Sequence, residues 1–222
     1  MITVHHLENS RSQRVLWLLE ELALPYQVKR YERDKKTNLA PKELLKVHPL
    51  GKSPVIEDAG AVIAETGAII EHVVDNYGQG RLVPAKGTDD YRRYKYWMHA
   101  AEGSYMPPLV MELFLTRMET AKMPFFAKPI AKKLTQGVRD AYLTHTTKAL
   151  FDYLDAELGK SDWLAGKDFT AADIIMSFPA EASLQRVAAA KSAKNLKAYV
   201  GRLHARPAYK RALEKGGPYA FA

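Results

Sequence analysis

Ser10 heads the residues of this chain whose types and spacing could do chemistry. It stands where a short β-branched segment gives way to a helical pattern, so its hydroxyl can cap that helix or donate a hydrogen bond into a site. Serine is a weak nucleophile without an adjacent base. Because the chain has no Gly-x-Ser-x-Gly turn and no suggestive His and Asp pair, hydrolysis by a Ser-His-Asp triad is not expected.

A potential anion site begins at Glu65 and Thr66, directly before an apolar helical pattern. The free N–H groups and the dipole of a helix N-terminus favour a carboxylate, and the Thr66 hydroxyl can add a hydrogen bond. Lys52 is a mobile point charge that could meet a second carboxylate. Each has a structural alternative: Thr66 as the cap of its own helix, and Lys52 as a solvated surface lysine.

Several other kinds of site are excluded or disfavoured. The chain has no cysteine, which rules out disulfides, thiolate metal sites and a cysteine nucleophile. His5 and His6 are neighbours in a predicted strand, so they point to opposite faces and cannot readily share an ion. We therefore predict no metal, and no glycine-rich phosphate loop is present.

The elements that must position these residues alternate between strand and helix over the first third of the chain. Strands are predicted over 2–7 and 26–31, and a hairpin over 54–57 and 61–64 with a glycine in its turn. Helical patterns cover 12–24, 41–46 and 66–77. This order predicts an α/β domain with a mixed sheet.

From residue 89 onward the patterns are helical. Helices are predicted over 91–118, 129–158, 171–190, 193–203 and 208–215. A glycine-rich stretch over 79–88 predicts a linker between a domain at 1–78 and an all-helical domain at 89–222. Thr170 and Asp173 predict a capping box at one of these helices, with Phe169 and Ile174 as its hydrophobic staple.

Charge and composition limit the remaining functions. The formal charge is +8, with net −1 in residues 1–80 and net +9 in the rest. The basic residues are scattered at helical spacing rather than clustered, so nucleic-acid binding is disfavoured. No apolar run reaches the roughly 18 residues of a membrane span, and no signal peptide is evident. No membrane association and a cytoplasmic location are expected.

Three segments together resemble the cytosolic glutathione transferase superfamily, in its serine-type members. They are Asn-Ser-Arg-Ser-Gln-Arg-Val at 9–15, His-Pro-Leu-Gly-Lys-Ser-Pro-Val at 48–55 and Glu-Thr-Gly-Ala-Ile-Ile at 65–70. The resemblance implies a thioredoxin-like domain with a mixed four-stranded sheet, followed by a C-terminal helical bundle. It also implies glutathione as co-substrate with no other cofactor, a small hydrophobic electrophile as second substrate, and a homodimer.

The same resemblance assigns roles to individual residues. The Ser10 hydroxyl would donate to the glutathione sulfur and favour its thiolate, with Ser12 or Arg11 as the alternative stabiliser. Ser53, before an expected cis Pro54, would pair its backbone with the cysteinyl unit. Glutathione would be bound by the residues Lys52, Ser53, Pro54, Glu65, Thr66 and Arg11.

A pocket for the electrophile is expected on the helical domain. Tyr105, Met106, Leu109 and Leu113, with Phe114, recur near a predicted kink at Pro107-Pro108. Isomerisation, peroxide reduction or dehalogenation at the same site would need the same residues. The alternative function that is not enzymatic is a module of the same fold that binds ligands or protein partners.

Overall fold

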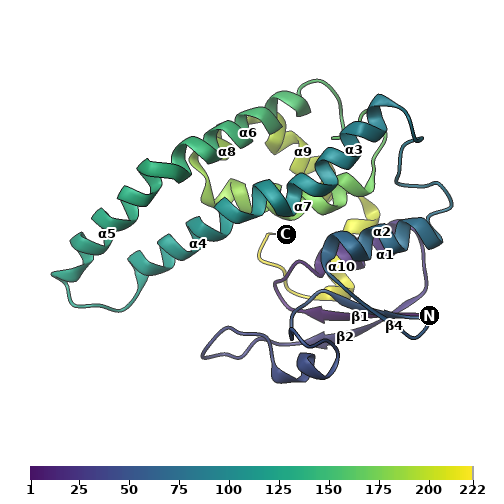
Figure 1. The fold of residues 1–222 in the computed structure, drawn as a ribbon, viewed down its shortest axis with the longest axis horizontal. Coiled ribbons are helices and arrows are strands. Elements are labelled where there is room, and N and C mark those ends of the chain that lie inside the picture. Colours follow the sequence, from purple (N-terminus) through teal and green to yellow (C-terminus); the bar gives the residue numbers. More distant parts are fainter. Residues whose placement is uncertain (222) are drawn as a thin grey trace.

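A four-stranded mixed sheet forms the base of the molecule in the computed structural model, which describes residues 1–221 (Figure 1). The strand order is β2-β1-β3-β4, with β1 parallel to β2 and the other pairs antiparallel. The strands are β1 (Ile2–Leu7), β2 (Tyr26–Tyr31), β3 (Val55–Asp58) and β4 (Ala61–Ala64). Five of the six residues of β1 are buried, as expected of a central strand covered on both faces.

Three helices and one short 3-10 turn accompany the sheet. They are α1 (Gln13–Glu21), η1 (Lys42–Lys46), α2 (Thr66–Tyr77) and α10 (Pro207–Gly216). Helix α10 returns from the far end of the chain to pack against α1. The predicted fold class is therefore confirmed: a thioredoxin-like α/β layer at the N-terminus, followed by a helical bundle.

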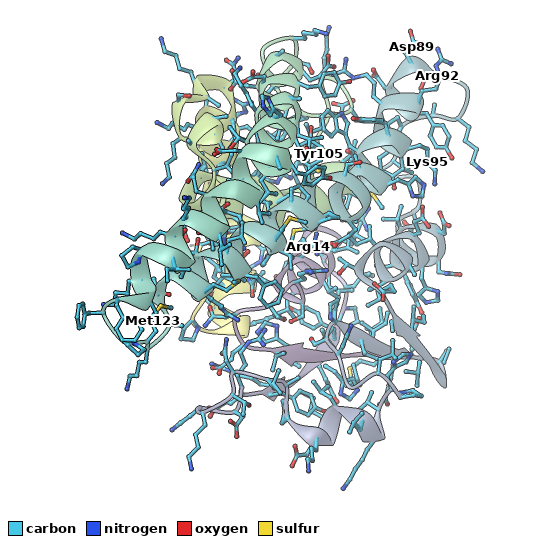
Figure 2. All side chains as sticks on the ribbon, turned by 60° about the vertical axis from the view of Figure 1, so that its left-hand side comes forward. Arg14, Asp89, Arg92, Lys95, Tyr105 and Met123 are labelled. Atoms are coloured by element: carbon cyan, nitrogen blue, oxygen red, sulfur yellow. The ribbon has the colours of Figure 1, made fainter. Side chains whose placement is uncertain are left out.

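The helical part contains two long antiparallel runs and a buried central helix (Figure 1). Helices α4 and α5 project together as a hairpin, with Met123 at its tip in Figure 2. The elements are α3 (Asp89–Ala100), η2 (Ala101–Tyr105), α4 (Met106–Thr120), α5 (Ala127–Val138), η3 (Arg139–Leu143), α6 (Thr144–Leu158), α7 (Ala171–Arg186), α8 (Ala188–Ser192) and α9 (Lys194–Ala205).

The single helix expected over 91–118 is interrupted by a π turn, η2. Pro107 and Pro108 occupy the first positions of α4, where a missing N–H costs least. The wider turn before them accommodates the lost helical hydrogen bonds, because the Met106 N–H donates to the Ala101 carbonyl. The helix expected over 171–190 likewise ends at Arg186, since Val187 is extended.

Asp173 anchors the start of the buried helix α7. Its carboxylate accepts from the Thr170 N–H at 2.9 Å and the Thr170 hydroxyl at 3.1 Å, as the predicted capping box requires. It also accepts from the Leu164 N–H at 3.0 Å and the Tyr199 hydroxyl at 3.1 Å. One buried carboxylate thus ties the preceding loop, α7 and α9 together.

Among residues 1–221, no helix is both long enough and apolar enough to cross a membrane.

Asp173→Ala should lower the free energy of unfolding by more than about 3 kcal/mol, because it leaves several buried donors without an acceptor. Chemical denaturation measures the change. Asp152→Ala is the matched control, since its carboxylate is exposed on α6 and pairs only with Lys148 four residues away. The control should stay within about 0.5 kcal/mol of the wild type. A loss for Asp173→Ala as small as the control's would contradict this role.

Candidate functional site

A cavity of about 900 Å³ lies between the sheet-bearing part and the helices. The loop after β1, the loop before β3 and the start of α2 form one wall; α4, the end of α7 and the C-terminal residues form the other. This cavity collects all seven residues that the sequence assigned to glutathione: Ser10, Arg11, Lys52, Ser53, Pro54, Glu65 and Thr66. Their proposed roles remain predictions, but the fold brings them to one place.

Ser10 begins a buried chain of hydrogen bonds. Its Oγ accepts from the Ser12 N–H at 3.2 Å and lies 2.7 Å from the Ser12 Oγ. The Ser12 Oγ in turn lies 2.8 Å from Nδ1 of His6, whose Nε2 lies 3.0 Å from the Gly216 carbonyl oxygen. A carbonyl only accepts, so Nε2 of His6 carries a proton.

The protonation of His6 sets the direction of this chain. Burial lowers the pKa of His6 to about 4, against a smaller raising effect of the bond to Gly216. At neutral pH Nδ1 is therefore an acceptor, and the Ser12 hydroxyl donates to it. The Ser12 oxygen is left to accept from Ser10. Ser12 is 0% exposed and does not line the cavity, whereas Ser10 is 6% exposed and does.

Arg14 and Glu102 hold the two walls together beside Ser10. The Arg14 guanidinium donates to the Ile175 carbonyl at 2.6 Å and to a Glu102 carboxylate oxygen at 2.6 Å. Burial lowers the pKa of Arg14, and the Glu102 charge opposes that shift. Arg11 lines the cavity, but it too is paired with Glu102, at 2.9 Å. Figure 2 shows Arg14 at the junction between the sheet-bearing part and the helices.

Glu65 and Thr66 open helix α2 toward the cavity. Glu65 has φ 71° and precedes the first helical residue, Thr66. The Thr66 Oγ1 accepts from Arg14 at 3.3 Å, which fixes the side chain. Within the described chain, the first turn of α2 carries no acidic residue. Its N-terminus can attract an anion, and the one acidic group beside it is that of the N-cap residue Glu65.

The Ser53–Pro54 bond is cis, as the resemblance implied. The Ser53 hydroxyl donates to the His5 carbonyl at 2.8 Å and accepts from the Leu7 N–H at 3.2 Å. These bonds attach the loop to the end of β1 and bring it close to Ser10. Lys52, one residue earlier, is exposed at the rim of the cavity.

Of the four residues predicted for the electrophile pocket, two line the cavity and two do not. Met106 and Leu113 line the cavity, but Tyr105 and Leu109 do not, because both are 0% exposed in the core. The Tyr105 hydroxyl donates to the Leu150 carbonyl at 2.9 Å, within the bundle. The residues of α4 that line the cavity are Met106, Val110, Leu113 and Arg117.

Several residues of the wall formed by α4, α7 and the C-terminal residues were not predicted from the sequence. Phe178 and Arg186 on α7, and Ala220 and Phe221 near the C-terminus, all line the cavity. It also missed the partnership of His6 with Ser12. Only the placement of an imidazole in an otherwise apolar strand end could have drawn notice to His6.

His5 and His6 do point to opposite faces of β1, as expected. His5 lies 2.9 Å from Glu57 and 2.8 Å from the Tyr31 hydroxyl, whereas His6 faces Ser12. Within residues 1–221, no group of three or more His, Asp or Glu side chains is arranged to hold a metal ion.

Two family models match the chain. The glutathione S-transferase N-terminal domain covers residues 1–75, and the glutathione S-transferase C-terminal domain covers residues 113–207. Among curated proteins, glutathione S-transferase 3 of Schizosaccharomyces pombe is 37% identical over 97% of this chain and 88% of its own length. Glutathione S-transferase 1 of Saccharomyces cerevisiae is 34% identical, covering 86% of this chain and 84% of its own.

A solved structure agrees with these matches. A glutathione S-transferase from Actinobacillus pleuropneumoniae superposes with a TM-score of 0.80 and is 34% identical. The match covers 100% of this chain and 95% of that one.

His6 should make the protein less stable in mild acid. Its pKa is about 6.5 when unfolded and about 4 when folded, so the unfolded state binds more protons between these values. Stability contributed by neutral His6 is therefore lost as pH falls from about 6.5 to about 4, by about 3 kcal/mol.

Unfolding free energies measured across this pH range test the effect. His6→Asn should flatten the acid-side slope, and His145→Asn, at an exposed position on α6, should leave it unchanged. Identical slopes for wild type and His6→Asn would show that His6 does not titrate as described.

Proposed function

The chain belongs to the glutathione S-transferase family, and from that premise we propose that Ser10 donates the hydrogen bond that stabilises the thiolate of bound glutathione. One observation carries the choice of residue. Ser10 reaches the cavity, whereas Ser12 is enclosed and its proton is directed to His6. Arg11 reaches the cavity as well, but its guanidinium is already held at 2.9 Å by Glu102, a carboxylate that it shares with Arg14.

The hydrogen bond of Ser10 and the N-terminus of α1 supply enough free energy to lower the pKa of the glutathione thiol. To bind the thiolate, the Ser10 hydroxyl exchanges a neutral bond to Ser12, worth ~0.5–1.5 kcal/mol, for a charge-assisted bond of ~1.5–3 kcal/mol. The N-terminus of α1 follows directly and adds ~0.3–1 kcal/mol. Since one pKa unit corresponds to about 1.36 kcal/mol, these contributions together lower the thiol pKa by about one to two units.

The remaining residues bind the rest of glutathione in this proposal. The γ-glutamyl carboxylate lies at the N-terminus of α2 against Thr66, and its ammonium donates to Glu65. The backbone of Ser53 pairs with the cysteinyl unit, next to Pro54. Lys52, mobile at the rim, meets the glycine carboxylate.

The reaction follows from this placement. The thiolate sulfur attacks an electrophilic carbon held beside Met106 and Leu113, a C–S bond forms, and the leaving group departs with its electron pair. No cofactor besides glutathione takes part in this step. Glutathione-dependent isomerisation, peroxide reduction or dehalogenation would begin from the same thiolate. A homodimer in the cytoplasm completes the proposal, supported by membership of the family.

Three single variants separate the rival stabilisers. Ser10→Ala should still bind glutathione but raise the pKa of its thiol by about one unit, because the charge-assisted bond is lost while the contribution of the α1 N-terminus remains. Ser12→Ala and Arg11→Met should keep the thiol pKa within about half a unit of wild type. Ultraviolet absorbance of the bound thiolate across pH, with calorimetry for binding, measures both. Loss of thiolate in Ser12→Ala but not in Ser10→Ala would assign the role to Ser12.

A further inference from the structure

The cavity is strongly cationic. Five arginines and lysines line it, but Glu65 is the only acidic residue in the lining among residues 1–221. The lining cations are Arg11, Arg33, Lys52, Arg117 and Arg186. Glutathione carries only two carboxylates, and the proposed function already places these at α2 and Lys52. Glutathione therefore does not account for all of this charge.

The guanidinium groups of three of the five cations form no ion pair, although the Glu8 carboxylate accepts from the Arg33 backbone N–H at 2.8 Å. Arg11 is paired with Glu102, and Lys52 is assigned above. By contrast, Arg33, Arg117 and Arg186 form no ion pair with any side chain of the described chain. Arg33 is held in place by neutral carbonyls, among them those of Glu8 at 3.2 Å and Asn38 at 3.1 Å.

These arginines also lie close enough to affect one another. Burial lowers the pKa of Arg186, and the neighbouring Arg117 lowers it further. Burial lowers the pKa of Arg33 too. The charge of Glu8 opposes this shift, and the charge of Arg117 adds to it. Arginine stays protonated in proteins, so these like charges repel one another, and an anion bound beside them would reduce that repulsion.

Apolar side chains line the same cavity as these cations and Ser10. They are Met106, Val110 and Leu113 on α4, with Phe178 and Phe221. The Arg186 guanidinium lies 5.6 Å from the centre of the Phe221 ring. An occupant that satisfies this wall has an apolar body and an anionic end.

We propose that the second substrate is an amphiphilic organic acid, with its electrophilic body beside Met106 and Leu113 and its anionic group held by Arg117 and Arg186. This inference rests on the proposed function, because it places the acid opposite the thiolate at Ser10. For a benzylic halide of this kind, the thiolate sulfur attacks the benzylic carbon. The C–S bond forms as the carbon–halogen bond breaks, and the halide leaves with the electron pair.

The thioether product of such a reaction tests the inference by binding alone. The probes are S-(para-carboxybenzyl)glutathione, its neutral methyl benzoate ester, and S-methylglutathione, titrated calorimetrically into the purified protein. The carboxylate probe should bind wild type at least about tenfold more tightly than the ester, as expected for a charge-assisted contact. Added salt should reduce this preference.

The double variant Arg117→Ala/Arg186→Ala should abolish the preference and leave S-methylglutathione binding unchanged. Arg92→Ala/Lys133→Ala removes the same charge from exposed positions outside the cavity and should keep the preference. Equal affinity of wild type for acid and ester, or a preference that survives the cavity variant, would overturn the inference. If S-methylglutathione itself fails to bind wild type, the proposed function fails first.

Discussion

A single buried guanidinium, that of Arg14, holds the two halves of the site in register. From α1 it reaches α7 through the Ile175 carbonyl, α2 through the Thr66 hydroxyl, and the π turn through Glu102. A buried charge is tolerated only when it is paired and hydrogen-bonded. The loop of Ser10, the N-terminus of α2 and the helical wall must therefore keep the relative positions that satisfy it.

The second constraint comes from the end of the chain. Gly216 accepts from His6, and the Ala220 N–H donates to the Asn9 side chain at 2.9 Å, on the loop that carries Ser10. Gly216, the last residue of α10, thus fixes the tautomer of His6, while Ala220 and Phe221 beyond it line one side of the cavity. Through Ser12, that tautomer decides which way the Ser10 hydroxyl points. The chemistry of a residue near the N-terminus depends in this way on the last helix.

Much of this could be predicted from the sequence, because local signals specified it. β-branched residues predicted β1, alternation predicted β2, and a glycine turn predicted the β3–β4 hairpin. Thr170 with Asp173 predicted the cap of α7. The segments that resemble the family located Ser10, Ser53 and Thr66, although they lie far apart in the chain.

What could not be predicted depends on tertiary packing. Helical spacing puts Tyr105, the last residue of η2, on a similar stripe to Leu109 and Leu113 of α4, but only the packed bundle decides which stripe is core. The π turn before Pro107 changes which residues face the core. Tyr105 lies in the core, and Met106 lines the cavity. Arg117 and Arg186 look like solvated charges in the sequence, and only the structure shows that both line the same cavity.

The position of the sulfur in a crystal structure of the complex with glutathione tests the central claim most directly. We expect the sulfur to lie within hydrogen-bonding distance of the Ser10 Oγ, with the γ-glutamyl carboxylate on the backbone N–H groups at the start of α2. A sulfur that contacts Arg11 instead, beyond reach of Ser10, would contradict it. So would a glutathione molecule bound in the reverse direction, with its glycine carboxylate at Thr66.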